Sequence, residues 1–249
     1  MRDFLNAFLA ERMKLKRTLA LWLVLLTPLL VAGIQLMILA NMDKLPWEGV
    51  SGWVWLQRSV GPIWSLFVFP MLIAVVTALH GAVEHTSGGW RRIFALPTSR
   101  PAICLAKLGW AHVLLLLTNL WLVLLLVGVG LLWHQLKPSF GFAGIIPSGS
   151  FLLMAVKFYL AAGFVISFQY WLANRSASFA LALGIGIGGT FVGMVQATGW
   201  YQKLFPWKYM INTQAAIEGV PELALALGIS GGIVLGALSV WDLARRDIT

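Results

Sequence analysis

Six long stretches without Asp, Glu, Lys or Arg dominate the pattern of apolar and polar positions. They are Thr18–Met42, Ser59–Val83, Leu108–Leu136, Phe158–Asn174, Ser176–Gln202 and Leu223–Trp241. A helix needs about 20 mainly apolar residues to cross the hydrocarbon core of a bilayer, and about 17 still suffice. Because lipid offers no hydrogen-bond partners, each segment must satisfy its own backbone, as a helix does. The pattern predicts six transmembrane helices, over about 19–41, 62–82, 109–133, 152–173, 178–198 and 222–241.

The composition indicates an all-α integral membrane protein with a single domain over residues 1–249. Hydrophobic residues make up 59% of the chain and charged residues 11%, and the mean hydropathy is +0.84. Globular chains carry about 25% charged residues. The net charge is +9, but the basic residues flank the apolar segments instead of forming one stripe. We therefore expect contact with membrane lipid and no binding of nucleic acid.

Lysines and arginines are unequally divided between the two sets of connections that six spans create. One set carries twelve of the eighteen and the other carries six. Because the side richer in Lys and Arg stays in the cytoplasm, both termini are predicted to be cytoplasmic.

Residues 2–17, before the first span, have the pattern of an amphipathic helix. Phe4, Leu5, Phe8, Leu9 and Met13 fall broadly on one face, and Asp3, Asn6, Glu11, Lys14 and Arg17 fall on the other. We expect this helix to lie on the inner leaflet, where basic residues meet anionic lipid. A plain extension of the first span is the alternative. The candidate interfacial residues are Phe4, Phe8, Glu11, Lys14, Lys16 and Arg17.

The connection Glu84–Lys107 is the most polar segment on the basic side. Gly88 and Gly89 interrupt the helix, and Trp90–Leu96 can form a short amphipathic turn. Its mixture of apolar and basic residues suggests a docking surface for a cytoplasmic partner, or else a loop anchored at the inner leaflet. The candidate docking residues are Glu84, Trp90, Arg91, Arg92, Ile93, Phe94 and Leu96.

Polar residues and glycines inside the predicted spans indicate contacts between helices. Gly228, Gly232 and Gly236 are spaced four apart, which allows close helix packing. Polar side chains in a bilayer usually face the bundle interior or a cavity. The predicted lining of a pathway is formed by span two, with Trp64 and Phe69, and by the stretch from Gln169 near the end of span four to Gln196 in span five. Before the last span, Tyr209–Ile217 is expected to form a short helix that dips toward the bilayer.

Catalytic and cofactor motifs are missing from the sequence. It contains no GxxxxGK[ST] phosphate loop and no HExxH, CxxC or GxSxG motif. His80 and His85 flank Glu84, but two histidines and one acid beside a loop are weak support for a metal site. We expect no catalytic residues, no metal and no bound cofactor, and therefore no enzyme.

Two segments resemble the permeases of ABC-2 type transporters, in particular the group that gives self-protection (immunity) against lantibiotics or bacitracin. The first is Glu11-x-x-Lys14-Leu15-Lys16-Arg17-Thr18 followed by Trp22. The second is Glu84 followed by Trp90-Arg91-Arg92, by Ala95–Arg100 and by Ala106-Lys107. The resemblance implies an exporter permease in a bacterial inner membrane, paired with a second copy or a diverged sister. It also implies two ATP-binding subunits that hold ATP and Mg²⁺, a coupling helix within Glu84–Arg100, and a re-entrant region before the last span.

Other classes of membrane protein remain as alternatives. A secondary carrier usually has intramembrane acids for ion coupling, and the predicted spans contain no Asp or Glu apart from Glu222 at the first position of the last span. A membrane scaffold or assembly factor is another alternative. With such a protein, no cargo would cross the membrane in a way that depends on a separate ATPase. The cargo, which could be a peptide antibiotic, a drug or a lipid-like molecule, is left open.

Overall fold

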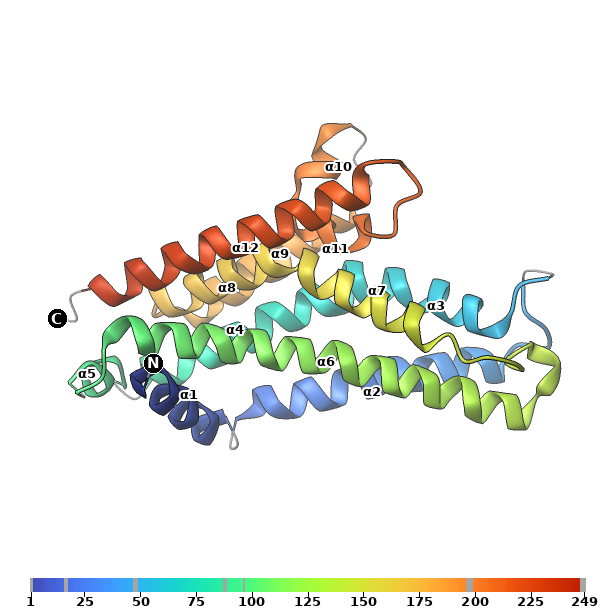
Figure 1. Cartoon of the computed structure of the whole chain (residues 1–249), viewed down its shortest axis with the longest axis horizontal. Coiled ribbons are helices and arrows are strands. Elements are labelled where there is room, and N and C mark those ends of the chain that lie inside the picture. Colours follow the sequence, from blue (N-terminus) through green and yellow to red (C-terminus); the bar gives the residue numbers. More distant parts are fainter. Residues whose placement is uncertain are drawn as a thin grey trace.

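A computed structural model describes residues 2–15, 18–46, 49–86, 89–95, 97–195 and 199–246. These residues form helices and turns, and no strand occurs among them. Figure 1 shows an elongated bundle in which the long helices run roughly along one axis. In chain order the elements are α1 (Arg2–Leu15), α2 (Leu19–Ala40), α3 (Gly52–Pro62), the π-helix η1 (Ile63–Val68), α4 (Phe69–Thr86), α5 (Gly89–Phe94), α6 (Arg100–Leu136), the 3-10 helix η2 (Pro138–Phe140), α7 (Ser148–Ala161), α8 (Gly163–Arg175), α9 (Phe179–Met194), α10 (Trp200–Leu204), the 3-10 helix η3 (Pro206–Lys208), α11 (Tyr209–Asn212) and α12 (Val220–Arg245).

Among the residues that the structure describes, four helical stretches are long and apolar enough to cross a membrane. They are Leu19–Ala40, Gly52–His85, Arg100–Leu136 and Val220–Arg245. Helices α7 and α8 meet this test together, with a bend of 45° between them, and would make a fifth span. The structure therefore supports a multi-pass membrane protein with four or five spans of sufficient length.

The fifth of the six predicted spans corresponds to α9, which is apolar but has only 16 residues. At 1.5 Å per residue this helix is about 24 Å long, shorter than a hydrocarbon core of about 30 Å. The count of six spans is therefore not confirmed and stays a prediction.

The second predicted span begins earlier than the hydropathy pattern indicates. Helix α3 starts at Gly52, where the Ser51 hydroxyl accepts a hydrogen bond from the backbone N–H of Val54, and it continues through η1 into α4. Pro62 and Pro70 flank the π-helical turn, and neither has a backbone N–H to donate. Inside this turn the Trp64 indole donates a 3.0 Å hydrogen bond to the Asn119 side chain of α6.

The main hydrophobic core is built chiefly from α2, α3, α4, α6, α7 and α8, and α12 packs most extensively against α8. The bend between α7 and α8 allows α12 to approach closely. A Cβ atom on Gly163 would lie 2.7 Å from the carbonyl oxygen of Gly228, and one on Gly232 would lie 2.7 Å from the carbonyl carbon of Gly163. Ser167 donates a 2.8 Å hydrogen bond to the Gly232 carbonyl across the same contact.

Short helices fill the segment between α9 and α12. Helix α10, η3 and α11 follow one another closely, and Figure 1 shows α10 projecting from the side of the bundle. Trp207 of η3 is buried against Gly189 of α9, so the segment folds back onto the bundle. The predicted short helix over Tyr209–Ile217 is present only as α11, which ends at Asn212.

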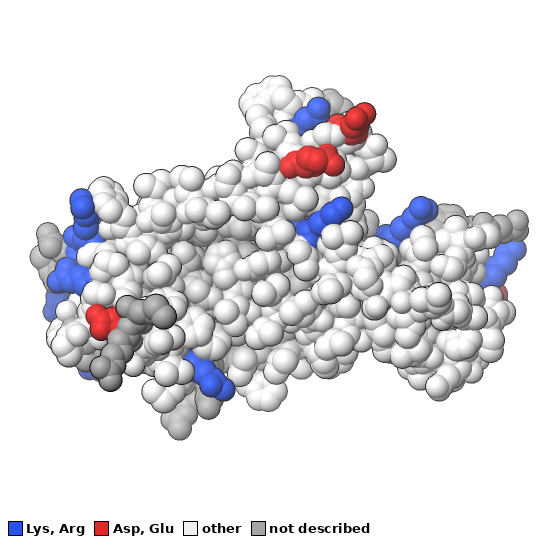
Figure 2. Space-filling model, in the orientation of Figure 1, with Lys and Arg blue, Asp and Glu red and all other residues white. Residues whose placement is uncertain are grey.

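Charged side chains gather at the ends of the bundle. Figure 2 shows most of the visible Lys, Arg, Asp and Glu at the two ends and on the projecting segment, with a largely uncharged surface between. Helix α1 and the last turn of α12 lie at the same end as α5 (Figure 1). This end, which we call the α5 end, holds the residues considered next.

Candidate functional site

A cluster of five ionisable side chains lies inside the α5 end of the bundle. We call it the charge cluster, and its members are Glu11, Lys14, His80, Glu84 and Lys107. The two residues of α1, the two of α4 and the one of α6 come from segments that are far apart in the sequence. The cluster therefore joins three helices at one point.

Lys107 lies at the centre of the charge cluster. Its ammonium group donates hydrogen bonds of 3.0 Å to Glu11 and 2.8 Å to Glu84. The Lys107 side chain is only 1% exposed, and those of Glu11 and Glu84 are 4% and 3% exposed. A buried charge is costly unless it is paired and hydrogen-bonded, and here each carboxylate neutralises part of the same cation.

Lys14 lies at the solvent-exposed edge of the charge cluster. Its ammonium lies 2.7 Å from both Glu11 and Glu84, and its side chain is 34% exposed. Burial by itself would lower the pKa of Lys14, but the charge of Glu11 and the hydrogen bonds to both carboxylates raise it above the usual lysine value. Lys14 is therefore held in its charged form.

The carboxylate of Glu11 is held in its charged form as well. Burial by itself would raise the pKa of Glu11, but a hydrogen bond from His80 and the charges of Lys107 and Lys14 together lower it well below the usual range. The His80 ring nitrogen Nε2 lies 3.3 Å from Glu11. Glu11 thus contacts α4 through His80 and α6 through Lys107.

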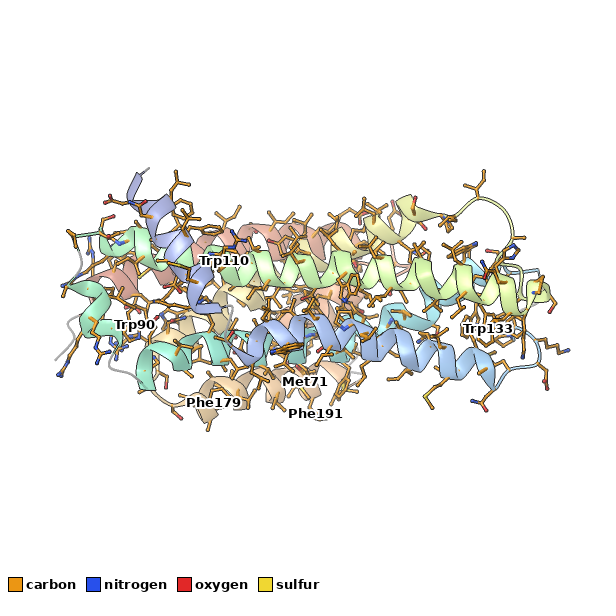
Figure 3. All side chains as sticks on the ribbon, turned by 90° about the horizontal axis from the view of Figure 1, so that it is seen from below. Met71, Trp90, Trp110, Trp133, Phe179 and Phe191 are labelled. Carbon is orange, nitrogen blue, oxygen red and sulfur yellow. The ribbon has the colours of Figure 1, made fainter. Side chains whose placement is uncertain are left out.

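Aromatic contacts fix α1 across α6 beside the charge cluster. The rings of Phe8 and Trp110 are stacked with their centroids 4.6 Å apart, and the Trp110 indole donates a 2.7 Å hydrogen bond to the Phe8 carbonyl. Gly109 leaves room for the Phe8 ring, which would lie 3.3 Å from a Cβ atom there. Figure 3 shows Trp110 where α1 crosses α6.

Helix α5 divides into an inner and an outer face. Trp90 is buried and packs with Cys104, Leu108, Tyr170 and Leu243, which belong to α6, α8 and α12. Figure 3 shows Trp90 at this end of the bundle and Trp133 at the opposite end. The Trp90 ring also lies 5.8 Å from the Lys107 ammonium, a distance that allows a cation–π contact. Trp90 thus links α5 to the charge cluster.

The rest of α5 follows the same division. Ile93 and Phe94 are partly buried and pack with Ala7, Ile103 and Ala106, so α5 also touches α1. Arg91 and Arg92 are exposed. A short helix within the predicted segment is therefore present, with its two arginines directed away from the bundle.

The structure brings together two groups of residues that sequence analysis treated separately. Glu11 and Lys14 of the amphipathic helix meet Glu84 of the predicted docking segment through shared ion pairs. Sequence analysis placed Glu11 on the polar face of an interfacial helix, and in the structure Glu11 is buried by α4 and α6. Phe4 and Phe8 face the bundle, while Leu5, Leu9 and Met13 are exposed. Helix α1 thus has two apolar stripes.

Lys107 is the functional candidate that sequence reasoning missed. It is one of the basic residues that set the predicted orientation and it ends the second resembling segment, but it was not among the candidate site residues. The available signal was a lysine one residue before a charge-free stretch of 29 residues, Leu108–Leu136, where a lone cation needs a partner.

Three of the four predicted pathway residues lie inside the bundle. Trp64, Phe69 and Gln169 are each 0% exposed. In the amide orientation that satisfies both groups, Gln169 donates to the Ala182 carbonyl at 3.1 Å and accepts from the Gly186 N–H at 3.0 Å, which joins α8 to α9. Their role in a pathway stays a prediction. Four candidate residues lie outside the described residues, namely Lys16, Arg17, Leu96 and Gln196.

The site is a network of ion pairs and hydrogen bonds that connects three helices. Its two carboxylates are engaged by two ammonium groups and a histidine. Within the described ranges, no three His, Cys, Asp or Glu side chains are grouped so that they could hold a metal ion. The arrangement can hold α1, α4 and α6 in one register and can transmit a displacement of α5 to them.

Comparison with known protein families gives one match. Residues 7–193, about three quarters of the chain, match the family model described as ABC-2 family transporter protein. This range contains α5 and every member of the charge cluster. No curated protein and no solved structure gives a match.

Proposed function

Because the chain belongs to the ABC-2 family of transporter proteins, we propose that it is the permease subunit of an ATP-driven exporter. Two such subunits, identical or one of them a diverged sister, pair in a bacterial inner membrane and bind two ATP-binding subunits. ATP and Mg²⁺ are held by those partners and not by this chain. The α5 end, with both termini, faces the cytoplasm.

The observation that carries this proposal is the two-sided character of α5. Arg91 and Arg92 point outward at the end of the bundle, whereas Trp90 is anchored among α6, α8 and α12. An outer face that carries positive charge suits a partner surface with acidic groups. A partner that moves Arg91 and Arg92 must also move Trp90, and with it the inner ends of three long helices.

The charge cluster extends this linkage to the rest of the bundle. Lys107 contacts Trp90 on one side and both carboxylates on the other, so a shift of α5 reaches α1 and α4 through charged contacts. Closure of the ATP-binding subunits would favour one arrangement of these helices, and cargo would favour the other. The difference in the affinity of the cargo for the two arrangements sets how strongly ATP closure and export are coupled.

Membrane lipid is a further partner in this proposal. Leu5, Leu9 and Met13 form an exposed apolar stripe on α1, with exposed fractions of 52%, 56% and 67%. A helix of this kind lies in the inner leaflet with its apolar stripe among the acyl chains. We also propose that α9 completes a set of six spans, since α9 is apolar throughout and a span shorter than the bilayer is accommodated by local thinning.

The proposed cargo is hydrophobic or amphipathic, such as a peptide antibiotic, a drug or a lipid-like molecule. Export of such a molecule would give self-protection, or immunity, and antibiotic resistance. The pathway would open beside Trp64, Phe69, Gln169 and Gln196 when the helices shift. Gly228, Gly232 and Gly236 keep α12 close to α7 and α8 during this movement.

The test is co-purification of this chain with candidate ATP-binding subunits in lipid nanodiscs. The ATP-binding subunits should no longer co-purify with the double variant Arg91→Glu/Arg92→Glu. This variant should still insert normally into the membrane. Lys44→Glu/Lys203→Glu is the matched control, because it changes the charge equally at exposed positions away from the α5 end. If the ATP-binding subunits co-purify normally with the Arg91/Arg92 variant, α5 has no docking role. If they fail to co-purify with both variants, the effect is not specific to α5.

A further inference from the structure

A groove between α8 and α12 plays no part in the proposed coupling. It has a volume of about 300 Å³ and is lined mainly by apolar and aromatic side chains. The lining residues are Phe168, Trp171, Leu235, Leu238, Ser239, Trp241 and Asp242. Leu238 and Trp241 are more than half exposed, so the groove opens sideways from the bundle.

The groove continues into a pocket of different chemistry at the α5 end. This basic pocket has a volume of about 490 Å³ and is lined by Arg175, Trp241, Asp242, Arg245 and Arg246. Trp241 and Asp242 line both cavities, so the two adjoin. Three arginines against one aspartate leave the pocket with an excess of positive charge.

The side chains of the basic pocket are held in place by contacts within the bundle. Asp242 accepts a 2.9 Å hydrogen bond from the Trp171 indole and lies 3.4 Å from the Arg175 guanidinium. The Arg245 guanidinium stacks over the Trp241 ring at 4.5 Å.

The third arginine ties α12 to the end of α8. Arg246 donates hydrogen bonds of 3.3 Å and 3.1 Å to the carbonyl groups of Asn174 and Arg175. Side chains fixed in this way lose little conformational entropy when they bind an anion.

We infer that the groove and the basic pocket together bind one anionic phospholipid. The arginines contact the phosphate, and an acyl chain enters the apolar groove beside Leu238. Arginine side chains match phosphate oxygens in geometry and charge. Basic pockets between the cytoplasmic ends of spanning helices suit anionic headgroups, and an indole such as that of Trp241 prefers the headgroup level.

The position of the site along α12 fits this ligand. Leu235 to Trp241 covers about 9 Å of helix, so the groove holds the part of an acyl chain that is nearest to the headgroup. The inference rests on the membrane setting of the proposed function and not on its ATPase partner. It can therefore be tested on the purified chain alone, and failure of ATPase docking would leave it unaffected.

The experiment is native mass spectrometry of the purified chain released from detergent that contains either phosphatidylglycerol or phosphatidylcholine. We expect one phosphatidylglycerol molecule to be retained and phosphatidylcholine to be retained about tenfold less, because charge-assisted hydrogen bonds to the arginines give the selectivity. Equal retention of the two lipids would overturn the inference.

Two variants separate the headgroup contacts from the acyl groove. Arg175→Gln/Arg245→Gln should reduce phosphatidylglycerol retention about tenfold, whereas Arg91→Gln/Arg92→Gln, which removes the same charge from exposed positions at the same end, should leave it unchanged. Leu238→Trp, which fills the groove without changing the charge, should also reduce retention. An equal loss with Arg91→Gln/Arg92→Gln, or full retention with Leu238→Trp, would overturn the inference. Displacement of the lipid by an equal concentration of glycerol phosphate would show a phosphate site instead of a lipid site.

Discussion

Lys107 of α6 donates a 3.0 Å hydrogen bond to Glu11 of α1, although 96 positions separate them in the sequence. The two side chains are 1% and 4% exposed, so neither charge is solvated by water. The pair attaches a helix outside the predicted spans to the interior of the bundle. It also explains how the amphipathic helix can be rigidly held while one of its apolar stripes stays exposed.

Removal of Lys107 should be strongly destabilising. Lys107→Met leaves Glu11 and Glu84 buried with only Lys14 and His80 as partners, and the loss of one member of a buried ion pair costs about 3–5 kcal/mol. The measurement is thermal unfolding of the purified chain in detergent. Lys14→Met is the control and should lower the Tm less, because its side chain is 34% exposed. Equal effects of the two variants would contradict the central position of Lys107.

Acid should release α1 from the bundle. The pKa of Glu11 is lowered in the folded chain, so its contribution to the free energy of unfolding is complete above the ordinary value of 4.5 and is lost as the pH falls below it. The pKa of Lys14 is raised above 10.5, so its contribution is complete below that value and is lost at higher pH. Both contributions are therefore complete between about pH 4.5 and 10.5, and the Tm should fall as the pH drops below or rises above this window.

The variant Glu11→Gln provides the comparison for this pH dependence. It should lower the Tm at neutral pH and flatten the fall on the acid side, since the group that titrates is gone. A Tm profile of Glu11→Gln that is parallel to that of the wild-type chain below pH 4.5 would show that other groups control the acid transition.

Loss of Trp90 should expose the single cysteine of the chain. Cys104 is 0% exposed and packs beneath Trp90, so a maleimide should label it slowly in the wild-type chain. Trp90→Ala removes contacts of about 3–5 kcal/mol, and labelling through local opening should be faster by about a hundredfold or more. Arg91→Ala, at an exposed position of the same helix, should leave the rate unchanged. Slow labelling of Trp90→Ala would show that α5 is held by other contacts.

Alanine substitutions at two glycines should have opposite effects on stability. At Gly163 the added methyl group would lie 2.7 Å from the Gly228 carbonyl oxygen, and such overpacking costs about 1–3 kcal/mol. At Gly184 the methyl group would meet no atom within 4 Å, and alanine is favoured over glycine in a helix by about 1 kcal/mol. Thermal unfolding in detergent measures both. Similar destabilisation by Gly163→Ala and Gly184→Ala would contradict the close contact of α8 with α12.

Much of the outline of this protein could be predicted from local patterns. The amphipathic helix before the first span and the short helix near Trp90 are both present, since each depends on residues within a few turns of one another. The burial of Glu11 could not be predicted in the same way. A helical wheel shows that Glu11 lies apart from Leu5 and Leu9, but it does not say which face of α1 meets the bundle.

Hydropathy was enough to predict a multi-pass membrane protein, because it acts through short stretches of chain. Where these stretches meet depends on tertiary packing. It placed Glu11, Glu84 and Lys107 in one buried cluster, bent α7 against α8 beside Gly163, and brought Arg175 next to α12. An ion pair in a low-dielectric interior requires partners from distant segments to converge within about 3 Å. That convergence results from the packing of the whole bundle, and no local pattern of apolar and polar residues contains it.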